Sequence, residues 1–358
     1  MAYEFGNDPA KKEGYLKFWK REPVKRPMVQ FTTISWFPFN EFRVSRAWPK
    51  GGELTPEMVD PEEFLDDWES LLREGETMDD DVFRGVYPFP ANYWCCASLG
   101  CKLRILPGNV VPENLSLAWD EAFARKLEFR HPWFKKYVAF LEALVKRSRG
   151  RYPVSHRSMQ GPLDIAVTLR GHEQILYDLM DEPETAGRLL DQLGDAFIAY
   201  TRETWRILPR FLDGCFDSQY SVWTPGSIAR MQEDAIAVIS PTLYEELVLP
   251  VDRKIAAAFE YPFLHLHPTS LFLLDLLLEN RNLKGFQVNH EINGPPMAEF
   301  LTHLRKIQAA GFPLIVRGSF SPEALQEFTD SLCPSGLLVN IMVKDRKESD
   351  ALRPILKM

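Results

Sequence analysis

The amino-acid sequence predicts an α/β fold, namely a single-domain (β/α)8 barrel of the TIM type. Eight short apolar segments with strand character alternate with segments of helical periodicity, and this alternation is typical of parallel strands joined by helices. Eight such units in one chain favour a closed barrel over an open sheet. The sequence also lacks the GxGxxG and GxxxxGK[ST] phosphate-binding loops, which removes the main support for a nucleotide-binding sheet.

Composition excludes several classes of protein. Apolar residues make up 45% of the 358 residues and aromatic residues 12%, enough for a large core and too many for a disordered chain. The net charge is -8 and no basic block is interleaved with aromatic residues, so we expect no nucleic-acid partner.

Cysteine spacing and hydropathy point to a cytoplasmic protein without membrane association. The five cysteines are irregularly spaced and do not resemble a disulfide framework. The N-terminus has no apolar signal-peptide core, and the longest apolar run, Leu271–Leu278, is too short to span a bilayer. We expect a monomer or a homodimer.

The first part of the chain is predicted to cover the barrel mouth. Residues 1–60 comprise an N-terminal extension, a first strand at Pro27–Thr33 and a long loop at 34–58 that is rich in Trp, Phe, Pro and Gly. Residues 61–358 form the remainder of the barrel. A helix is expected to begin near Pro61, because proline suits the first turn and the acids Glu62 and Glu63 suit the positive end of the helix dipole.

The middle of the chain contains three further strand candidates separated by long helices. The strands are Val82–Phe89, Pro153–Ser158 and Leu212–Asp217, and the helices span 116–148, 183–208 and 241–259.

The last part has the most regular rhythm of short strands and helices. The strands are Phe263–His267, Phe286–His290, Leu314–Gly318 and Leu337–Val343, and the helices are Leu271–Glu279, Met297–Ala309, Pro322–Ser331 and a short one from Arg346.

Two histidines, His265 and His267, stand at the end of one predicted strand. Residues i and i+2 of a strand face the same side, and barrels carry their chemistry at the C-terminal ends of their strands. The pair therefore indicates a metal site or a polar substrate floor, with two hydrogen-bonded neutral histidines as the alternative. Glu291 on the next strand is the predicted third ligand, because His2Glu is a standard zinc set; alternatively it is an acid at a helix start or the ion-pair partner of Arg317. His290 and Cys333 are the alternative third ligands.

Other residues near the predicted mouth have chemistry suited to a substrate. Arg317 is a candidate anion clamp or the partner of a rim ion pair, and Asp217 a candidate general base or hydrogen-bond acceptor. Flat or polar surfaces for the substrate are expected from Tyr93, Trp94, His156, Gln160, Tyr220 and Trp223.

Several short motifs, in order, resemble the uroporphyrinogen decarboxylase superfamily, over roughly residues 80–343. They are Gln160-Gly161-Pro162-Leu163, Leu169-Arg170-Gly171, Asp181-Glu182-Pro183-Glu184, Trp223-Thr224-Pro225-Gly226, Glu233-Asp234, Ser240-Pro241, Tyr244-Glu245, His265-Leu266-His267 and Arg317-Gly318-Ser319-Phe320-Ser321-Pro322. The resemblance implies a (β/α)8 barrel, in agreement with the strand count.

Two branches of this superfamily lead to different expectations. True uroporphyrinogen decarboxylases carry an arginine-rich stretch near the N-terminus, where this chain has Met28–Trp36 without arginine. The other branch, zinc methyltransferases that act with corrinoid proteins, uses a His-x-Cys pair and a later Cys. Here His265 matches the first ligand, His267 replaces the cysteine, and no cysteine lies in Leu337–Val343.

The resemblance therefore implies a metal-dependent methyltransferase or demethylase that binds Zn2+ or another divalent metal. It would act on a small methylated substrate or acceptor together with a corrinoid-binding partner protein. Replacing thiolate by imidazole predicts a harder, more Lewis-acidic metal. The alternatives are a metal-free lyase acting on a carboxylated substrate and a non-catalytic binder of a small ligand or tetrapyrrole.

Overall fold

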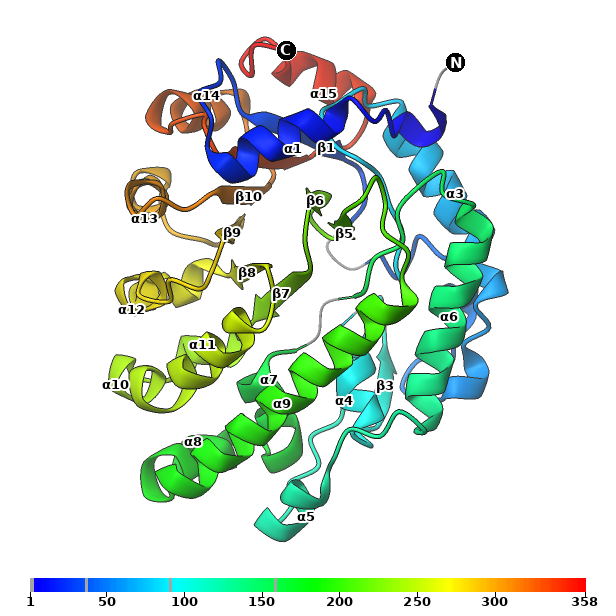
Figure 1. Cartoon of the computed structure of the whole chain (residues 1–358), viewed down its shortest axis with the longest axis vertical. Coiled ribbons are helices and arrows are strands. Elements are labelled where there is room, and N and C mark those ends of the chain that lie inside the picture. The colour runs from blue at the N-terminus through cyan, green and yellow to red at the C-terminus, as the bar shows by residue number, and fades with distance from the viewer. Residues whose placement is uncertain (1–2, 36–37, 90–91, 158–159) are drawn as a thin grey trace.

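A six-stranded parallel sheet forms the centre of the protein (Figure 1). The computed structural model describes residues 3–35, 38–89, 92–157 and 160–358. In the sheet order β1-β11-β10-β9-β8-β7, the strands are β1 (Met28–Thr32), β11 (Leu337–Met342), β10 (Leu314–Gly318), β9 (Gly285–His290), β8 (Tyr261–Leu266) and β7 (Ile228–Gln232).

Helices join these parallel strands and cover the outside of the sheet (Figure 1). Between β7 and β8 the chain forms η3 (Asp234–Val238), α10 (Pro241–Leu243), the π-helical turn η4 (Tyr244–Val248) and α11 (Leu249–Ala257). The later connections contain η5 (Pro268–Leu273), α12 (Leu274–Leu278), α13 (Met297–Ala309) and α14 (Pro322–Ser331), and α15 (Arg346–Leu352) follows β11.

Long helices cover the part of the molecule built by residues 43–207. They are accompanied by short helices and by a three-stranded antiparallel sheet. The elements are α2 (Arg43–Ala47), β2 (Glu53–Leu54), η2 (Pro56–Met58), α3 (Glu62–Glu76), α4 (Trp94–Ser98), β3 (Leu103–Leu106), β4 (Asn109–Pro112), α5 (Trp119–Ala124), α6 (Pro132–Ser148), α7 (Pro162–Arg170), α8 (His172–Asp181) and α9 (Pro183–Ile207).

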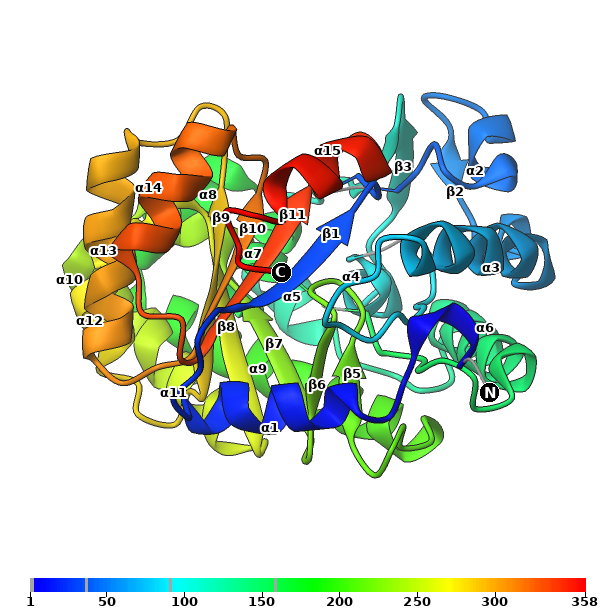
Figure 2. The same cartoon turned by 90° about the horizontal axis from the view of Figure 1, so that it is seen from above.

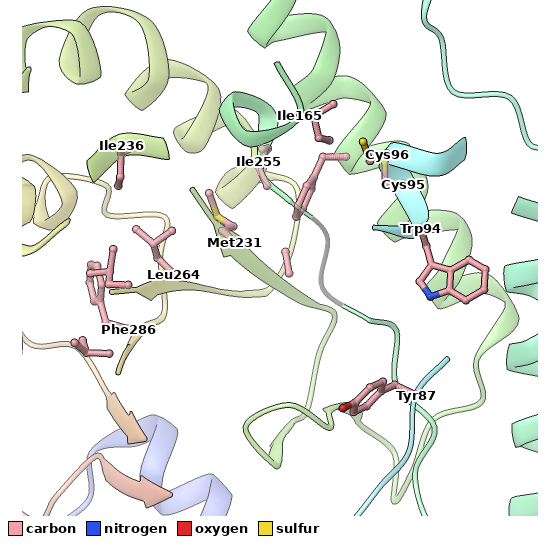
Figure 3. Packing of buried hydrophobic residues seen from close by; sticks show 14 of the residues in the cluster. Tyr87, Trp94, Cys95, Cys96, Ile165, Met231, Ile236, Ile255, Leu264 and Phe286 are labelled. Carbon is pink, nitrogen blue, oxygen red and sulfur yellow. The ribbon is translucent and has the colours of Figure 1, made fainter. Parts of the chain in front are cut away.

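Outward-facing strand residues form the main hydrophobic layer between sheet and helices. Met231, Leu264 and Phe286 are at most 2% exposed, and they pack with Ile236 and Ile255 from the connection between β7 and β8 (Figure 3). Successive side chains of a strand point to opposite faces, so the remaining residues of each strand face the interior of the barrel-like fold.

The N-terminal helix α1 (Lys11–Lys20), which follows η1 (Glu4–Gly6), closes the end at which the strands begin (Figure 2). Its Tyr15 hydroxyl donates to the Ser221 carbonyl at 2.7 Å, and Trp19 Nε1 donates to the Trp223 carbonyl at 2.8 Å. Tyr15 and Phe18 pack with Phe263 and other inward-facing apolar residues. This end of the sheet is thereby closed, and the opposite end stays open.

The predicted closed barrel is only partly formed by regular strands. The segments predicted as strands at Val82–Phe89 and Pro153–Ser158 contribute one parallel bridge, between Val86 and Val154; Ser158 lies outside the described residues. The predicted strand Leu212–Asp217 shortens to β5 (Cys215–Asp217), which pairs antiparallel with β6 (Val222–Thr224). The sequence did not predict β7.

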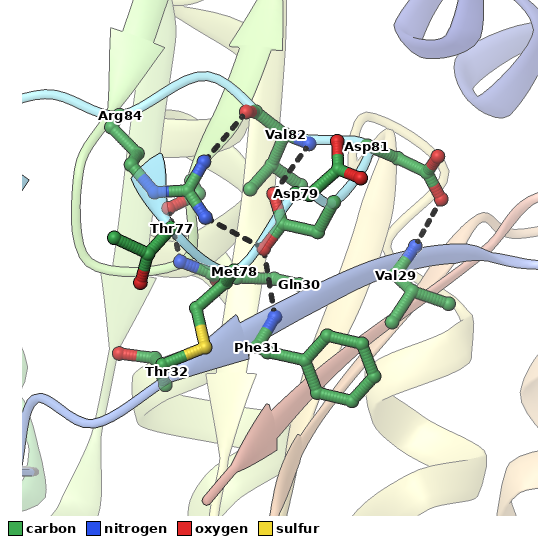
Figure 4. A network of polar contacts seen from close by, with 12 residues as sticks. Val29, Gln30, Phe31, Thr32, Thr77, Met78, Asp79, Asp81, Val82 and Arg84 are labelled. Atoms are coloured by element: carbon green, nitrogen blue, oxygen red, sulfur yellow. Dashed lines mark hydrogen bonds and ion pairs between the residues drawn. The ribbon is translucent and has the colours of Figure 1, made fainter. Parts of the chain in front are cut away.

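Side chains, rather than a regular strand, occupy the outer edge of β1. The carboxylates of Asp80 and Asp81 accept the β1 backbone N–H groups of Phe31 and Val29, each at 2.9 Å (Figure 4). Arg84 donates to Asp80 at 2.8 Å and fixes that carboxylate. The N–H groups on the outer edge of β1 are thus satisfied without a regular ladder to a second strand.

The β5–β6 loop enters the barrel interior, where inward-facing polar side chains hold it. Asn340 donates to the Tyr220 carbonyl at 2.9 Å, Gln30 donates to the Ser221 hydroxyl at 2.7 Å, and Arg317 donates to the Gln219 carbonyl at 3.1 Å. The interior above the apolar floor is therefore polar, in contrast to the branched aliphatic layers of most such barrels. None of the helices in the described ranges is long and apolar enough to cross a bilayer.

Candidate metal centre

A cavity of about 780 Å³ opens at the C-terminal ends of β7, β8 and β9. Parallel strands bring their C-terminal ends to one edge, and these three strands supply part of the polar lining of the cavity. The strand-end residues that line the cavity are Arg230, Gln232, Asp234, His265, His267, Asn289 and Glu291.

Three potential metal ligands converge in this cavity. One donor atom each from Asp234, His265 and His267 lie within 4.8 Å of one another. The Nε2 atoms of the two histidines are 3.2 Å apart, and His267 Nε2 is 3.5 Å from Asp234 Oδ1. The predicted histidine pair therefore meets a carboxylate, but it is the carboxylate of Asp234 rather than that of Glu291.

Glu291 lies on the opposite side of the His267 ring. Its Oε1 accepts a hydrogen bond from His267 Nδ1, so the carboxylate orients the ring and directs Nε2 toward His265 and Asp234. Glu291 consequently occupies the position of a residue that supports a ligand, which differs from its predicted role as the third ligand.

A chain of hydrogen bonds along β9 connects Glu291 to His265. Asn289 Nδ2 donates to Glu291 Oε1 at 3.4 Å, Gln287 Nε2 donates to Asn289 Oδ1 at 3.0 Å, and Gln287 Oε1 contacts His265 Nδ1. An ionised carboxylate can only accept, so it turns the amide group of Asn289, and then that of Gln287, in one direction. The Gln287 carbonyl therefore faces His265 and accepts a hydrogen bond from its Nδ1–H.

The direction of this chain leaves His265 with a lone pair on Nε2, and His267 has one as well when its ring is neutral. Two Nε2 lone pairs 3.2 Å apart repel each other unless a proton or a cation lies between them. Two neutral imidazoles with a nearby carboxylate form a donor set typical of divalent metals such as Zn2+. The residues present thus fit a metal ion.

The surroundings shift the pKa values of the two histidines in opposite directions. Burial, together with the charges of His267 and Arg230, holds the pKa of His265 well below its usual value. For His267, burial is outweighed by the hydrogen bond to Glu291 and by the charge of Asp234, which raise its pKa. The hydrogen bond to His267 in turn lowers the pKa of Glu291. His265 is therefore neutral and ready to coordinate at physiological pH.

Asp234 is fixed by two carboxylates that cap helices. Asp164, in the first turn of α7, accepts from the backbone N–H groups of Asp234 and Ala235 at 3.1 and 2.8 Å. Glu233, which precedes η3, accepts from Leu163 N at 3.1 Å in α7. Burial and the charge of Asp234 raise the pKa of Asp164 to about 8. Sequence reasoning noted Glu233-Asp234 as a motif but assigned no role to it, because β7 was not recognised as a strand.

Three of the predicted substrate residues line the cavity, namely Tyr93, Gln160 and Tyr220. The Tyr220 hydroxyl also lies 2.9 Å from His265 Nδ1. These three predicted substrate-binding residues thus line the same cavity as the histidine pair.

The other predicted substrate residues serve in packing. Trp223 is fully buried at the N-terminal end, where its Nε1 donates to the Phe211 carbonyl at 2.8 Å. Trp94 packs against Trp133 and Tyr137, and His156 packs edge-on against Trp205. None of these three is among the residues that line the cavity.

The predicted catalytic pair stabilises the β5–β6 loop. Asp217 Oδ1 accepts from Tyr220 N at 2.9 Å, and Arg317 donates to the carbonyls of Gln219 and Ile34 at 3.1 and 3.2 Å. Both side chains are buried and neither lines the 780 Å³ cavity. Their position favours a structural role over direct contact with substrate.

The two alternative third ligands do not join the donor group. His290 lines the cavity, but its ring stacks on Phe320 and its Nδ1 lies 3.0 Å from the Ser319 carbonyl. Cys333 is exposed in the turn between α14 and β11, at the N-terminal end of that strand.

The arrangement of elements is shared with a known enzyme. The structure is similar to that of a methyltransferase from Methanosarcina mazei, with a TM-score of 0.68, 97% of this chain and 98% of that chain covered, and 13% sequence identity. The two proteins share a fold. No protein-family model matches the chain, and no curated protein matches its sequence. At this identity the likeness concerns the fold alone, and the function has to be argued from the site.

Proposed function

We propose that this protein is a metal-dependent methyltransferase or demethylase that acts on a small methylated substrate or acceptor. The observation that carries the proposal is the convergence of His265, His267 and Asp234 at the floor of a large cavity. The shared fold with a methyltransferase adds support. Zn2+ is the proposed metal, and another divalent ion would suit the same ligands.

Each residue of the site has a distinct task in this proposal. His265, His267 and Asp234 would hold the metal, and Glu291 and Gln287 keep the imidazole Nε2 atoms directed toward it. A divalent ion held there would supply Lewis acidity, which would polarise a methyl donor or lower the pKa of a methyl acceptor. With no thiolate ligand the site would favour oxygen or nitrogen groups over soft sulfur.

The methyl group is proposed to pass to or from a corrinoid on a separate protein. Val238 and Ile292 line the cavity and are 61% and 97% exposed, so the rim of the cavity presents apolar side chains to solvent. A corrinoid-binding partner docking over this rim would bring its cofactor to the mouth of the cavity.

Metal analysis tests the first step of this proposal. Protein expressed with zinc, iron and cobalt supplied is expected to contain close to one equivalent of one of these metals. The variants H265A, H267A and D234A are expected to lose it, and D195A on the outer helix α9 serves as a matched control. Less than about one-tenth of an equivalent in the wild-type protein would overturn the metal site.

Methyl transfer is tested separately. Methylcobalamin and cob(I)alamin serve as probes, and transfer is followed by their absorbance with candidate acceptors or methylated amines, alcohols and thiols. Transfer that requires His265 supports the proposal. Release of carbon dioxide from a carboxylated substrate by metal-free protein would instead establish the lyase, and ligand binding without turnover would establish the binder.

A further inference from the structure

Buried guanidinium groups lie next to the candidate metal centre. Arg157, Arg230 and Arg317 are 2%, 1% and 4% exposed, and all three surround the β5–β6 loop. Arg157 contacts Gln219 Oε1 and lies over the Tyr87 ring, 4.2 Å from its centre; Arg230 lies 5.1 Å from the centre of the Tyr220 ring. Arginine keeps its charge in proteins, so these positions concentrate positive charge in the barrel interior.

Arg157 and Arg230 form no ion pair within the described parts of the chain. Their hydrogen bonds go to the neutral side chains of Asn92, Gln219 and Gln232. Arg157 Nη2 and Arg230 Nε are buried and have no hydrogen-bond partner among the described residues. The nearby carboxylate of Asp217 accepts from the Tyr220 N–H.

Burying a charged side chain without a counterion is costly, so buried charges are usually paired with a group of opposite sign. Burial, with the neighbouring Arg230 charge, lowers the pKa of Arg157 to about 10. Arg230 lines the 780 Å³ cavity, together with the amide side chains of Gln160, Gln219 and Gln232. The guanidinium group of Arg230 and these amide groups therefore supply hydrogen-bond donors to a cavity large enough for a small molecule.

Arg230 lies close to the proposed metal ligands. Arg230 Nη2 donates to Gln232 Oε1 at 3.1 Å, and Gln232 Nε2 donates to Asp234 Oδ2 at 2.7 Å. On the other side, Tyr220 contacts both the Arg230 guanidinium and His265. On each side a single residue, Gln232 or Tyr220, thus lies between Arg230 and a proposed metal ligand.

We infer that the cavity binds a small anionic substrate, with a carboxylate or a similar oxyanion held by Arg230 and its other end directed toward Asp234, His265 and His267. Arg157 does not line the cavity, but its charge interacts with that of Arg230 and supplies a second positive charge, and the neighbouring amides supply further donors. The inference deepens the proposed function by naming its substrate class, but the anion site stands on its own charge arrangement.

The test measures anion binding to metal-free protein, so its outcome does not depend on the metal. Acetate, succinate and inorganic phosphate are titrated by calorimetry in low-chloride buffer, with acetamide and choline as neutral and cationic probes. At least one anion is expected to bind with a dissociation constant below about 10 mM, a range open to ligands of this size. Acetamide and choline are expected not to bind.

Substitutions locate the site. Arg230→Met is expected to weaken anion binding at least about tenfold, in keeping with the loss of a charged hydrogen bond. Arg206→Met, which removes the same charge from the exposed face of α9, should leave it unchanged. If Arg230→Met does not fold, Arg230→Lys and Arg157→Met are measured in its place, and at least threefold weakening is expected of each.

Equal binding of acetamide and acetate, no binding of any anion, or unchanged anion affinity in the arginine variants would overturn the inference. Anion binding by a protein that retains no metal would support the inference while removing the metal-based function. Metal binding without anion binding would do the reverse.

Discussion

Asp164 and Glu233 cap each other's helical segments: Asp164 in α7 caps η3, and Glu233, just before η3, caps α7. Together they fix Asp234. Asp164 accepts two backbone N–H groups at the start of η3, whereas Glu233 accepts one at the start of α7. Helix starts leave such donors without partners, and a carboxylate is a favourable acceptor for them. The proposed third ligand therefore depends on a residue 70 positions away in the sequence.

Replacing Asp164 by Ala should disturb both stability and metal binding. The change leaves two N–H groups of η3 without acceptors, at a cost of about 2 kcal/mol in the free energy of unfolding. Denaturant unfolding and metal titration measure the two effects. Asp120→Ala, in the exposed first turn of α5, is the control. Unchanged metal affinity in a folded D164A protein would show that Asp234 needs no such support.

Asn289 should control the metal affinity without touching the metal. Asn289→Leu interrupts the chain from Glu291 to Gln287, so the Gln287 amide no longer has a fixed direction. Loss of a supporting hydrogen bond of this kind typically reduces metal affinity about 10–100-fold. Competition with a chelating dye measures it, and Asn282→Leu in an exposed loop is the control. Wild-type affinity in N289L would contradict the role of the β9 chain.

Gly161 is required for close contact between α7 and the end of β7. A Cβ atom at this position would lie 2.0 Å from the Gln232 carbonyl oxygen and 2.3 Å from Glu233 Cδ. Gly161→Ala should therefore destabilise the protein by about 2 kcal/mol or more, because backbone has to move.

The matched control for this change is Gly187→Ala in α9, where a Cβ would meet only Leu247 at 3.6 Å. Alanine favours the helix there, so G187A should be neutral or stabilising by up to about 1 kcal/mol. Thermal unfolding of the two variants gives the comparison, and similar melting temperatures would contradict the contact at Gly161.

Asp252 should make stability fall as the pH rises. Its carboxyl is 2% exposed and accepts from the Tyr244 hydroxyl at 2.8 Å, and burial raises its pKa from 3.8 to about 7. The folded protein therefore keeps a proton that the unfolded chain releases. The contribution of this proton to the free energy of unfolding is complete below pH 4. It decreases by at most about 1.4 kcal/mol per pH unit as the pH rises, and it is gone above pH 7.

Asp252→Asn keeps the acceptor for Tyr244 and removes the titration. Relative to wild type, the variant should gain stability between pH 5 and pH 8, measured by urea unfolding at both values. Asp195→Asn on the exposed face of α9 is the control. A variant whose difference from wild type is the same at both pH values would refute the prediction.

The sequence predicted the regular part of the fold and missed the irregular part for identifiable reasons. Strands β8 to β11 recur at regular intervals between helices, and their bounds agree with the prediction to within two residues. In β7 the residues Arg230 and Gln232 alternate with apolar ones, and the strand follows β6 without an intervening helix. Neither a long apolar run nor the strand–helix rhythm therefore marks it. Near β1, Asp80 and Asp81 replace strand pairing with side-chain hydrogen bonds, which periodicity cannot reveal.

The candidate site was predictable where it depended on local spacing. His265 and His267 share a face because they are two residues apart, and the structure brings their Nε2 atoms together. The roles of Asp217, Arg317 and Trp223 depend on the path of the β5–β6 loop through the barrel. Such long-range placement leaves no periodic signal in the sequence. Residue type alone therefore suggested catalytic or substrate-binding roles for side chains that the structure shows stabilising the loop.

The pairing of β1 with β11 has a consequence for how the protein is made. Met28 lies beside Leu338 in the sheet, and α1 rests on residues of the β5–β6 hairpin. A ribosome therefore has to synthesise nearly the whole chain before β1 meets its neighbour. Contacts of such long sequence separation fold slowly, and until then the apolar residues Val29 and Phe31 stay accessible to chaperones.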